Sequence, residues 1–303
     1  MKNSSLPKIT IFTPTYNRAK LIHRVYDSLI AQKTQNFEWL IIDDGSTDNT
    51  AEVVQQLTKN AKFTTEYIYR ENRGKVYSIN EALNIAKGEF FLVFDSDDWC
   101  SEDALVEFIS AWEALTPLEK EEYSGVSCLK AYQNGEIVGE DYKRISKKGA
   151  SYVDRFNKRI KGDKWEFIKT DIHRENCYRI LKNDRYMAPE YAWLNIGKKY
   201  KTIFLNKPLG VIEYQEDGIS KNNLMHRVGS ANSTCGFYLL AFKVSVGAKN
   251  KIKSLSNYIR FSFHAHRLEL FRTRYLVPAI ILGAALYAID SYKLNRAKEK
   301  NGR

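Results

Sequence analysis

Residues 88–98 read Gly-Glu-Phe-Phe-Leu-Val-Phe-Asp-Ser-Asp-Asp, and this stretch decides the fold. An apolar run at 90–94 ends abruptly in three carboxylates, Asp95, Asp97 and Asp98. Apolar runs of this length that are rich in Phe and Val are typical of a central strand. In open α/β sheets, ligands bind beyond the carboxyl ends of the strands. The stretch therefore predicts a buried strand with a ligand site at its end; the alternative is a strand followed by an acidic helix cap.

The spacing of the first two carboxylates fits a metal ion. Asp95 and Asp97 are two residues apart at the predicted strand end, so both can approach one hard divalent cation. Such a cation usually also holds phosphate oxygens. An isolated Asp-x-Asp pattern is weak evidence, and its weight comes from the sequence that precedes it.

Three strand–helix units precede this strand. Strands are predicted at residues 8–13, 37–42 and 65–70, and they run into polar turns at 14–18, 43–48 and 71–75. The segments after the turns carry apolar residues at helical spacing. Gly45 allows a tight turn, Thr47 or Asp48 can cap the next helix, and Gly88 fits a helix C-cap. This alternation predicts an α/β fold with a doubly wound, mostly parallel sheet.

Four motifs together resemble the family 2 glycosyltransferases, which are inverting enzymes with the GT-A fold. They are Pro-Thr-Tyr-Asn-Arg at 14–18, Asp-Asp-Gly-Ser-Thr-Asp at 43–48, Asn-Arg-Gly-Lys at 72–75 and Asp-Ser-Asp-Asp at 95–98. The resemblance covers residues 6–115, weakens through 116–220 and is nearly absent beyond. We expect a GT-A domain over residues 1–235, divided into a nucleotide-sugar-binding half (1–115) and an acceptor half (116–235). A helical, basic extension would occupy residues 236–303.

The resemblance implies a role for each polar strand end. Asp97, with Asp95, would hold Mn²⁺ or Mg²⁺ against the diphosphate of a nucleotide-sugar. Asp44 would accept the uracil N–H of a UDP-sugar, and Asp43 would brace the same loop. The other predicted nucleotide-sugar contacts are Pro14, Tyr16, Asn17, Arg18, Asn72, Arg73, Lys75 and Ser96.

The catalytic base is expected in the acceptor half. Pro189-Glu190 at a predicted helix start resembles the segment in which many family members place a catalytic carboxylate. The usual form is Glu-Asp, whereas this chain has Pro-Glu-Tyr at 189–191. Glu190 would take the proton of an acceptor hydroxyl as that hydroxyl attacks, giving one displacement with inversion. Asp184 and Asp171 are the next candidates, and Glu190 would otherwise only stabilise the first turn of a helix.

The rest of the acceptor half is predicted from strand and turn signals. Strands are expected at 124–133, 163–171 and 209–214, with a hairpin turn at Asn134-Gly135. Residues 215–221 follow the last strand. Lys221, His226 and Arg227 are candidates for contact with a diphosphate when this loop closes; the alternative is an exposed linker.

The positive charge of the chain is concentrated at its end. The net charge is +11, yet residues 1–115 carry a net −5 and residues 243–303 a net +10. Within the last segment, residues 276–289 are mostly apolar and have Lys and Arg on both sides. This run is short for a membrane span, which needs about 20 residues. It suits an interfacial helix on an anionic membrane; the alternatives are a helix docked on the core or a homo-oligomer interface. Nucleic-acid binding is not expected, because the basic residues surround an apolar block.

Cysteine usage and the N-terminal sequence bear on the compartment. The four cysteines lack metal-type spacing, and nothing resembles a signal peptide, so we expect a cytoplasmic protein at the inner face of the cell membrane. The leading hypothesis is hexosyl or N-acetylhexosaminyl transfer from a UDP-sugar to a lipid-linked or polysaccharide acceptor. The alternatives are transfer to a polyprenyl phosphate, which needs no base, and a non-catalytic sugar-nucleotide-binding protein.

Overall fold

The chain divides into two units. The computed structural model describes residues 7–181, 183–215, 222–270 and 272–301, with side chains to residue 296. Unit 1 comprises Met1–Tyr178 and Asn195–Lys221, and unit 2 comprises Arg179–Leu194 and Asn222–Arg303. The domain boundary expected at residue 235 lies inside helix α10 (Ala231–Val244), which belongs to unit 2.

The described residues of unit 1 form one eight-stranded sheet in the order β3-β2-β1-β4-β7-β6-β8-β5. Its strands are β1 (Ile9–Thr15), β2 (Phe37–Asp43), β3 (Thr64–Tyr69), β4 (Phe90–Val93), β5 (Trp99–Cys100), β6 (Tyr123–Tyr132), β7 (Lys164–Lys169) and β8 (Lys201–Ile212). β1 pairs in parallel with β2 and β4, and β2 pairs in parallel with β3. The four predicted strand–turn units are therefore confirmed, and their carboxyl ends share one edge.

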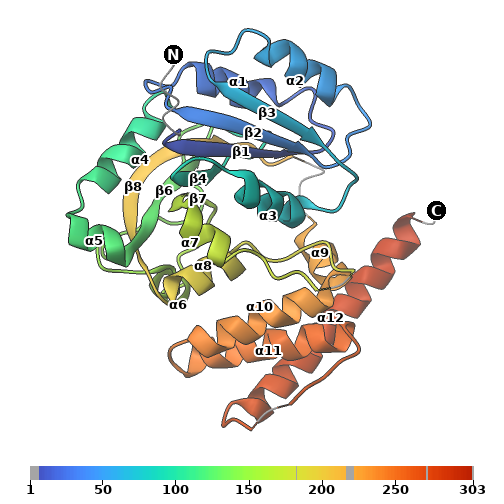
Figure 1. Cartoon of the computed structure of the whole chain (residues 1–303). Helices are drawn as coiled ribbons and strands as arrows, with labels where there is room; N and C mark the ends of the chain where they lie inside the picture. The colour runs from blue at the N-terminus through green and yellow to red at the C-terminus, as the bar shows by residue number, and fades with distance from the viewer. Residues whose placement is uncertain (1–6, 182, 216–221, 271, 302–303) are drawn as a thin grey trace. The chain divides into compact units, whose positions relative to one another are not determined.

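Helices cover both faces of the parallel strands. Figure 1 shows α1 (His23–Ile30) and α2 (Thr50–Thr58) on one side of β1–β3 and α3 (Lys75–Ile85) on the other. All seven residues of β1 and of β2 are buried, as expected for strands covered on both faces. The other helices of unit 1 are α4 (Ala104–Glu113), α5 (Pro117–Glu122), α6 (Tyr152–Asn157) and α7 (Thr170–Glu175). The prediction of a doubly wound sheet is confirmed.

The second half of the sheet is mixed, as predicted. β7 lies between β4 and β6 and is antiparallel to both. After β6 the chain reverses at Asn134-Gly135, where the Gly135 N–H donates to the Tyr132 carbonyl at 2.9 Å, so the predicted turn is confirmed. β8 starts at Lys201, earlier than the predicted 209, because register shifts against β6 accommodate Pro208.

One glycine prediction is wrong. Helix α3 ends at Ile85 with Ala86 as its C-cap, so Gly88 caps no helix. A Cβ at Gly88 would lie 2.2 Å from the Thr10 backbone nitrogen. Gly88 is instead required because the chain passes directly against β1. Gly45 does adopt a positive φ of 87°, as the tight turn after β2 requires.

Unit 2 is helical. It contains α9 (Asn223–Gly229), α10, α11 (Ala248–His264) and α12 (Leu276–Asn301), while α8 (Glu190–Gly197) begins in unit 2 and ends in unit 1. The backbone N–H groups of Arg185 and Tyr186 donate to the Ser230 hydroxyl, each at 3.0 Å, which joins residues 179–194 to the C-terminal helices. α12 is longer than the apolar run at 276–289. Its residues Leu276–Arg296 are long and apolar enough to cross a membrane by length and composition.

Candidate active site

The polar turns of unit 1 meet at the carboxyl edge of β1–β4. Thr15 at the end of β1 pairs with Asp43 at the end of β2, and Asp43 pairs with Tyr69 of β3. The Phe94 N–H donates to the Phe12 carbonyl at 2.8 Å, so the 95–98 turn leaves the sheet beside β1. Sequence segments that are 20–30 residues apart therefore build one site, as the pattern of strand ends predicts.

Asn17 joins the first turn to the second. Its side-chain oxygen accepts hydrogen bonds from the backbone N–H groups of Thr47 (2.8 Å) and Asp48 (3.3 Å), and its own N–H donates to the Ser46 hydroxyl. Its φ of 52° is a left-handed conformation that Asn tolerates. The Asn17 side-chain oxygen is therefore occupied by hydrogen bonds within the protein. The predicted contact of Asn17 with a nucleotide-sugar stays a prediction.

Asp43 and Asp44 hold the loops around them. Asp43 is fully buried and accepts from the Ser46 N–H (2.7 Å) and the Tyr67 hydroxyl (2.6 Å). Asp44 accepts from the N–H groups of Arg73 (2.9 Å) and Gly74 (2.7 Å). The oxygen that accepts from Arg73 also pairs with the Arg70 guanidinium at 3.3 Å. The other oxygen keeps a second lone pair, and a nucleobase N–H can still bind there.

The other predicted nucleotide contacts differ in exposure. Pro14 is buried within β1, whereas Tyr16 just beyond the strand is 45% exposed. Ser96 is buried and Asn72 is exposed. The Arg73 guanidinium lies over the Tyr77 ring at 4.5 Å. Tyr16, Asn72 and Arg73 therefore present side chains that a ligand at this edge can reach.

Lys75 and Asp95 form an ion pair at the centre of the site. The Lys75 ammonium, at the first residue of α3, lies 2.5 Å from an Asp95 carboxylate oxygen. Burial opposes ionisation of Asp95, but the charges of Lys75, Lys130 and Arg18 outweigh it and hold the pKa of Asp95 below its usual value. Asp95 is therefore a carboxylate at neutral pH.

Asp97 has the opposite electrostatic balance. Burial, and then the charge of Asp95, raise the pKa of the Asp97 carboxyl, with Lys75 and Arg18 opposing. In the described part of the chain no Lys or Arg side chain forms an ion pair with Asp97. The negative charge of these two neighbouring carboxylates is only partly balanced by Lys75 and Arg18. Such a pair suits a divalent cation, which would relieve the repulsion between them.

The donor set fits Mn²⁺ or Mg²⁺. Asp95 and Asp97 supply hard oxygen ligands, and within the described ranges no group of three His, Cys, Asp or Glu side chains is arranged to hold a metal. Mg²⁺ is commonly bound through one or two carboxylates, with substrate phosphates and water completing its shell. The pair is therefore suited to a metal that arrives with a diphosphate.

Lys130 is a residue that the sequence analysis missed. Its ammonium lies 2.6 Å from an Asp98 carboxylate oxygen, and both side chains are buried. Burial lowers the pKa of Lys130, but Asp98 and Asp95 outweigh it and raise the value, so the ammonium stays charged. Lys130 thus turns Asp98 away from the metal role and anchors the 95–98 turn to β6. The signal was present in the sequence, because Lys130 follows Val126 and Cys128 on the core-facing side of a predicted strand.

Replacing Lys130 by Met should destabilise the protein by about 3–5 kcal/mol, because it leaves the Asp98 carboxyl buried without its ionic partner. The double variant Lys130→Met/Asp98→Asn should recover most of this loss. Lys148→Met removes an exposed pair with Glu119 and should cost no more than about 1 kcal/mol. Denaturant unfolding of the four proteins measures these differences; equal effects of the two single Lys variants would contradict the buried-pair account.

The predicted base lies outside unit 1. Glu190 is the first residue of α8, belongs to unit 2 and is exposed; its catalytic role stays a prediction. Asp184 is buried and accepts from the Ser233 N–H at 2.6 Å, at the start of α10. Asp171 pairs with Arg174 at 2.5 Å. His226 stacks on Tyr186 within unit 2, and Lys221 lies outside the described residues.

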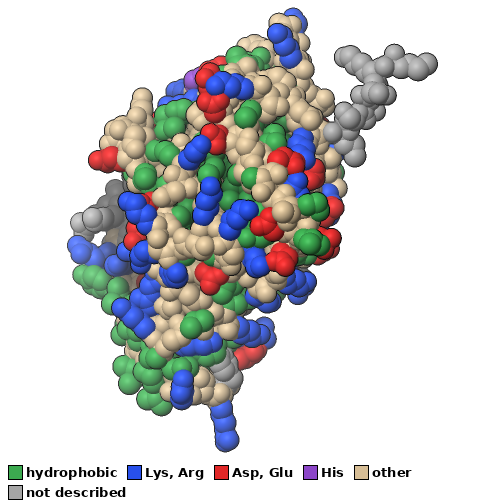
Figure 2. Space-filling model, turned by 90° about the vertical axis from the view of Figure 1, so that its left-hand side faces the viewer, with side chains coloured by type: hydrophobic (Ala, Val, Ile, Leu, Met, Phe, Trp, Pro, Cys, Tyr) green, Lys and Arg blue, Asp and Glu red, His purple; other side chains and the backbone are tan. Residues whose placement is uncertain are grey.

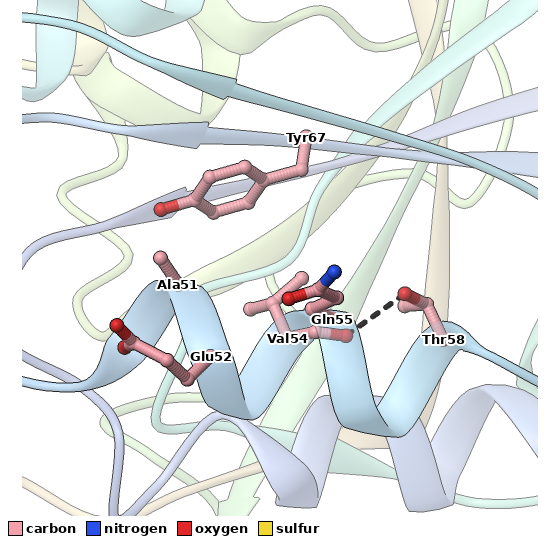
Figure 3. Close-up of a pocket in the computed structure, with 6 residues that line it drawn as sticks. All are labelled: Ala51, Glu52, Val54, Gln55, Thr58 and Tyr67. Carbon is pink, nitrogen blue, oxygen red and sulfur yellow. Dashed lines mark hydrogen bonds between the residues drawn. The ribbon is translucent and has the colours of Figure 1, made fainter.

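A separate hollow in unit 1 carries no comparable chemistry. Its lining residues are Ala51, Glu52, Val54, Gln55, Thr58 and Tyr67, from α2 and β3 (Figure 3). Thr58 donates to the Val54 carbonyl, and the Tyr67 hydroxyl donates to Asp43. Glu52 is its one charged residue, so we assign the hollow no catalytic role.

The sheet and its acidic strand end define a class of protein. A doubly wound sheet with an antiparallel extension and C-terminal helices is the GT-A fold, and solved structures of that fold match nearly the whole chain. The chain belongs to glycosyl transferase family 2, whose family model matches residues 10–175. The predicted family and fold class are confirmed.

Two curated relatives illustrate the family. Glycosyltransferase GlyA of Streptococcus pneumoniae is 26% identical over 230 residues, covering 71% of this chain and 32% of GlyA. The GalNAc(5)-diNAcBac-PP-undecaprenol beta-1,3-glucosyltransferase of Campylobacter jejuni is 26% identical over 271 residues, covering 85% of this chain and 77% of that protein. The matched region is thus about a third of GlyA and most of the Campylobacter enzyme.

Two solved structures show the same fold. Staphylococcus aureus TarS in complex with UDP-GlcNAc has a TM-score of 0.60 at 18% identity, covering 96% of this chain and 92% of that one. The mannosyltransferase PcManGT of Pyrobaculum calidifontis, in complex with GDP-Man and Mn²⁺, has a TM-score of 0.58 at 17% identity, covering 99% and 82%. At these identities the likeness establishes the fold, and the donor is a separate question.

Proposed function

We propose that this protein is an inverting, metal-dependent glycosyltransferase that moves a sugar from a UDP-sugar to a hydroxyl of a lipid-linked or polysaccharide acceptor. The observation that carries the proposal is the Asp95–Asp97 pair, held at the end of β4 by Lys75 and crowded enough to favour a cation. The reaction would take place at the inner face of the cell membrane.

The residues of unit 1 have separate tasks in this reaction. Mn²⁺ or Mg²⁺, when bound by Asp97 and Asp95, supplies positive charge that stabilises the departing diphosphate. Asp44 and Tyr16 lie at the ends of β2 and β1, where they would hold the base, and Lys75 fixes the orientation of Asp95. Glu190 would accept the proton of the attacking hydroxyl.

The acceptor class is proposed from a relative. The Campylobacter protein is named for a glycan on a diphospho-undecaprenol, which is a lipid-linked acceptor. A second candidate is transfer to a polyprenyl phosphate, whose anionic oxygen needs no general base. Glu190, at the start of α8, favours the hydroxyl acceptor, because only a hydroxyl has to give up a proton to a carboxylate base as it attacks.

Incubation with a panel of nucleotide-sugars tests the proposal. The panel contains UDP-glucose, UDP-GlcNAc, UDP-GalNAc and GDP-mannose, each with Mn²⁺ and with EDTA. We expect release of UDP from one UDP-sugar, dependent on the metal, and faster in the presence of a lipid-linked oligosaccharide. Metal-dependent thermal protection by a UDP-sugar without any turnover would favour a binding protein, and a preference for GDP-mannose would overturn the donor assignment.

Asp44→Asn tests the base-recognition role. The amide keeps the shape of the side chain but replaces one acceptor oxygen with a donor. Because the base does not change on the way to the transition state, KM for the donor should rise about 10-fold or more, with kcat nearly unchanged. A large fall in kcat at unchanged KM would assign Asp44 to the chemistry instead.

A further inference from the structure

Helix α12 has one face that is firmly packed against α11. Ala279 is fully buried in a cluster with Leu255, Tyr258 and Ile259. A Cβ at Gly283 would lie 2.7 Å from the Ser256 carbonyl oxygen, so the two helices approach closely there. These positions lie on one side of α12, because they are four residues apart.

A buried ion pair continues the same face. Asp290 is 2% exposed, and its two carboxylate oxygens accept from the Arg260 guanidinium at 2.5 and 2.6 Å. The His264 Nε2 lies 3.2 Å from the same carboxylate. A two-pronged Arg–carboxylate contact fixes orientation as well as distance. The face that α12 turns toward α11 is therefore determined.

The opposite face of α12 is apolar and has no cover within the described residues of unit 2. Val277, Ile281 and Tyr292 are 69%, 68% and 63% exposed. Pro278, Leu282, Ala284, Ala285, Ala288 and Ile289 are also exposed. We call these nine residues the outer face. At 1.5 Å per residue it extends for about 22 Å along the helix. On ordinary protein surfaces exposed apolar residues are scattered singly, whereas these residues form one continuous strip.

The charge around the outer face indicates what covers it. Arg272, Arg274, Lys293 and Arg296 flank it and are exposed. Two of the three acidic residues in 243–303 are already paired, Asp290 with Arg260 and Glu269 with Arg267. A second copy of the chain would bring two strongly basic segments together, which is unfavourable. An apolar strip between cations instead complements anionic headgroups above acyl chains.

The packing also decides how α12 meets a membrane. By length and composition the helix is able to span a bilayer, but the side opposite its outer face is packed against α11, which contains Lys249, Lys251 and Lys253. A span would carry the Arg260–Asp290 pair to hydrocarbon depth, and charged groups are costly there. A helix that lies in the interface plane buries the outer face and leaves α11 on the aqueous side.

We propose that the outer face of α12 docks the protein, in the plane of the interface, on an anionic lipid surface, with the Arg260–Asp290 pair fixing which face meets the lipid. The surface lies outside the residues assigned to sugar transfer, so its test is independent of the proposed function.

Co-sedimentation of the full chain with vesicles tests the proposal. We expect binding to vesicles of phosphatidylglycerol and phosphatidylcholine at low salt, and much weaker binding to phosphatidylcholine alone or at 1 M salt. Ile281→Asp should weaken binding at least about 10-fold, because it places a charge where apolar burial is required. Leu118→Asp, on α5 of unit 1 and 77% exposed, should leave binding unchanged.

The double variant Lys293→Glu/Arg296→Glu should weaken binding at least about 25-fold, at about fivefold per basic charge removed. Since both side chains are exposed, the variants should fold normally, and their thermal unfolding provides the check. Equal binding by wild type and Ile281→Asp would overturn the proposal. So would a discrete dimer in lipid-free solution that Ile281→Asp dissociates, or resistance of the membrane-bound protein to alkaline extraction, which would indicate a span.

Discussion

Replacing Asp97 by Asn should abolish sugar transfer while leaving the fold at least as stable as before. A metal acting on a departing diphosphate supplies several kcal/mol, so losing its ligand should reduce kcat/KM by a factor on the order of 10³ or more. Stability should not fall, because burial and repulsion from Asp95 already oppose the Asp97 charge. At this residue a loss of activity is therefore expected without a loss of stability.

Thermal unfolding with and without metal separates this account from simple damage. Mn²⁺ with the UDP-sugar should raise the melting temperature of the wild type but not of Asp97→Asn. Asp103→Asn, which changes an exposed carboxylate paired with Lys33, should retain both activity and metal-dependent protection. Near-normal turnover of Asp97→Asn at saturating Mn²⁺ would remove Asp97 from the metal site.

The parallel half of the fold was predictable because its signals are local. The apolar runs before residues 14, 43, 71 and 95 each end in polar turns, and this alternation specifies strands whose ends share one edge. The pairing of Lys75 with Asp95 joins two such ends directly. The sequence therefore predicts, from topology alone, that these residues lie close together.

The remaining features depend on contacts that are distant in sequence. Pro208 interrupts the apolar pattern of β8, and only the bulged register against β6 shows how it is accommodated. Residues 179–194 join the C-terminal helices through hydroxyl and carboxylate contacts such as Asp184–Ser233. Short polar segments have no hydrophobic periodicity from which such partners could be predicted. The length of α12 was underestimated because the helix continues beyond its apolar run.

Those distant contacts change the ranking of candidate bases. Asp184 was the next candidate after Glu190, but its carboxylate accepts the Ser233 N–H and is buried. A carboxylate that organises a helix start has a structural task, and removing its charge should lower stability. Asp171 is exposed and paired with Arg174. Glu190, exposed at the first residue of α8, remains the residue we propose.

Glu190→Gln should reduce kcat by roughly 10²–10⁴ with little change in KM for the donor. The amide keeps the size of the side chain and removes its basicity, so the acceptor hydroxyl loses its proton acceptor while donor binding is retained. Asp171→Asn is the matched control and should retain normal kcat. Asp184→Asn should instead lower the melting temperature, with the folded fraction retaining its turnover.

The same measurement discriminates between the two acceptor classes. A hydroxyl must lose a proton as it attacks, whereas a phosphate oxygen is already anionic at neutral pH, so only hydroxyl transfer requires a base. If Glu190→Gln transfers sugar to a lipid-linked oligosaccharide at the wild-type rate, Glu190 is not the base of that reaction. If the variant is fully active and the wild type prefers a polyprenyl phosphate over the oligosaccharide, the acceptor is the phosphate and the hydroxyl mechanism is wrong. A loss of donor binding in Glu190→Gln, measured by calorimetry with UDP and Mn²⁺, would place Glu190 in the nucleotide site instead.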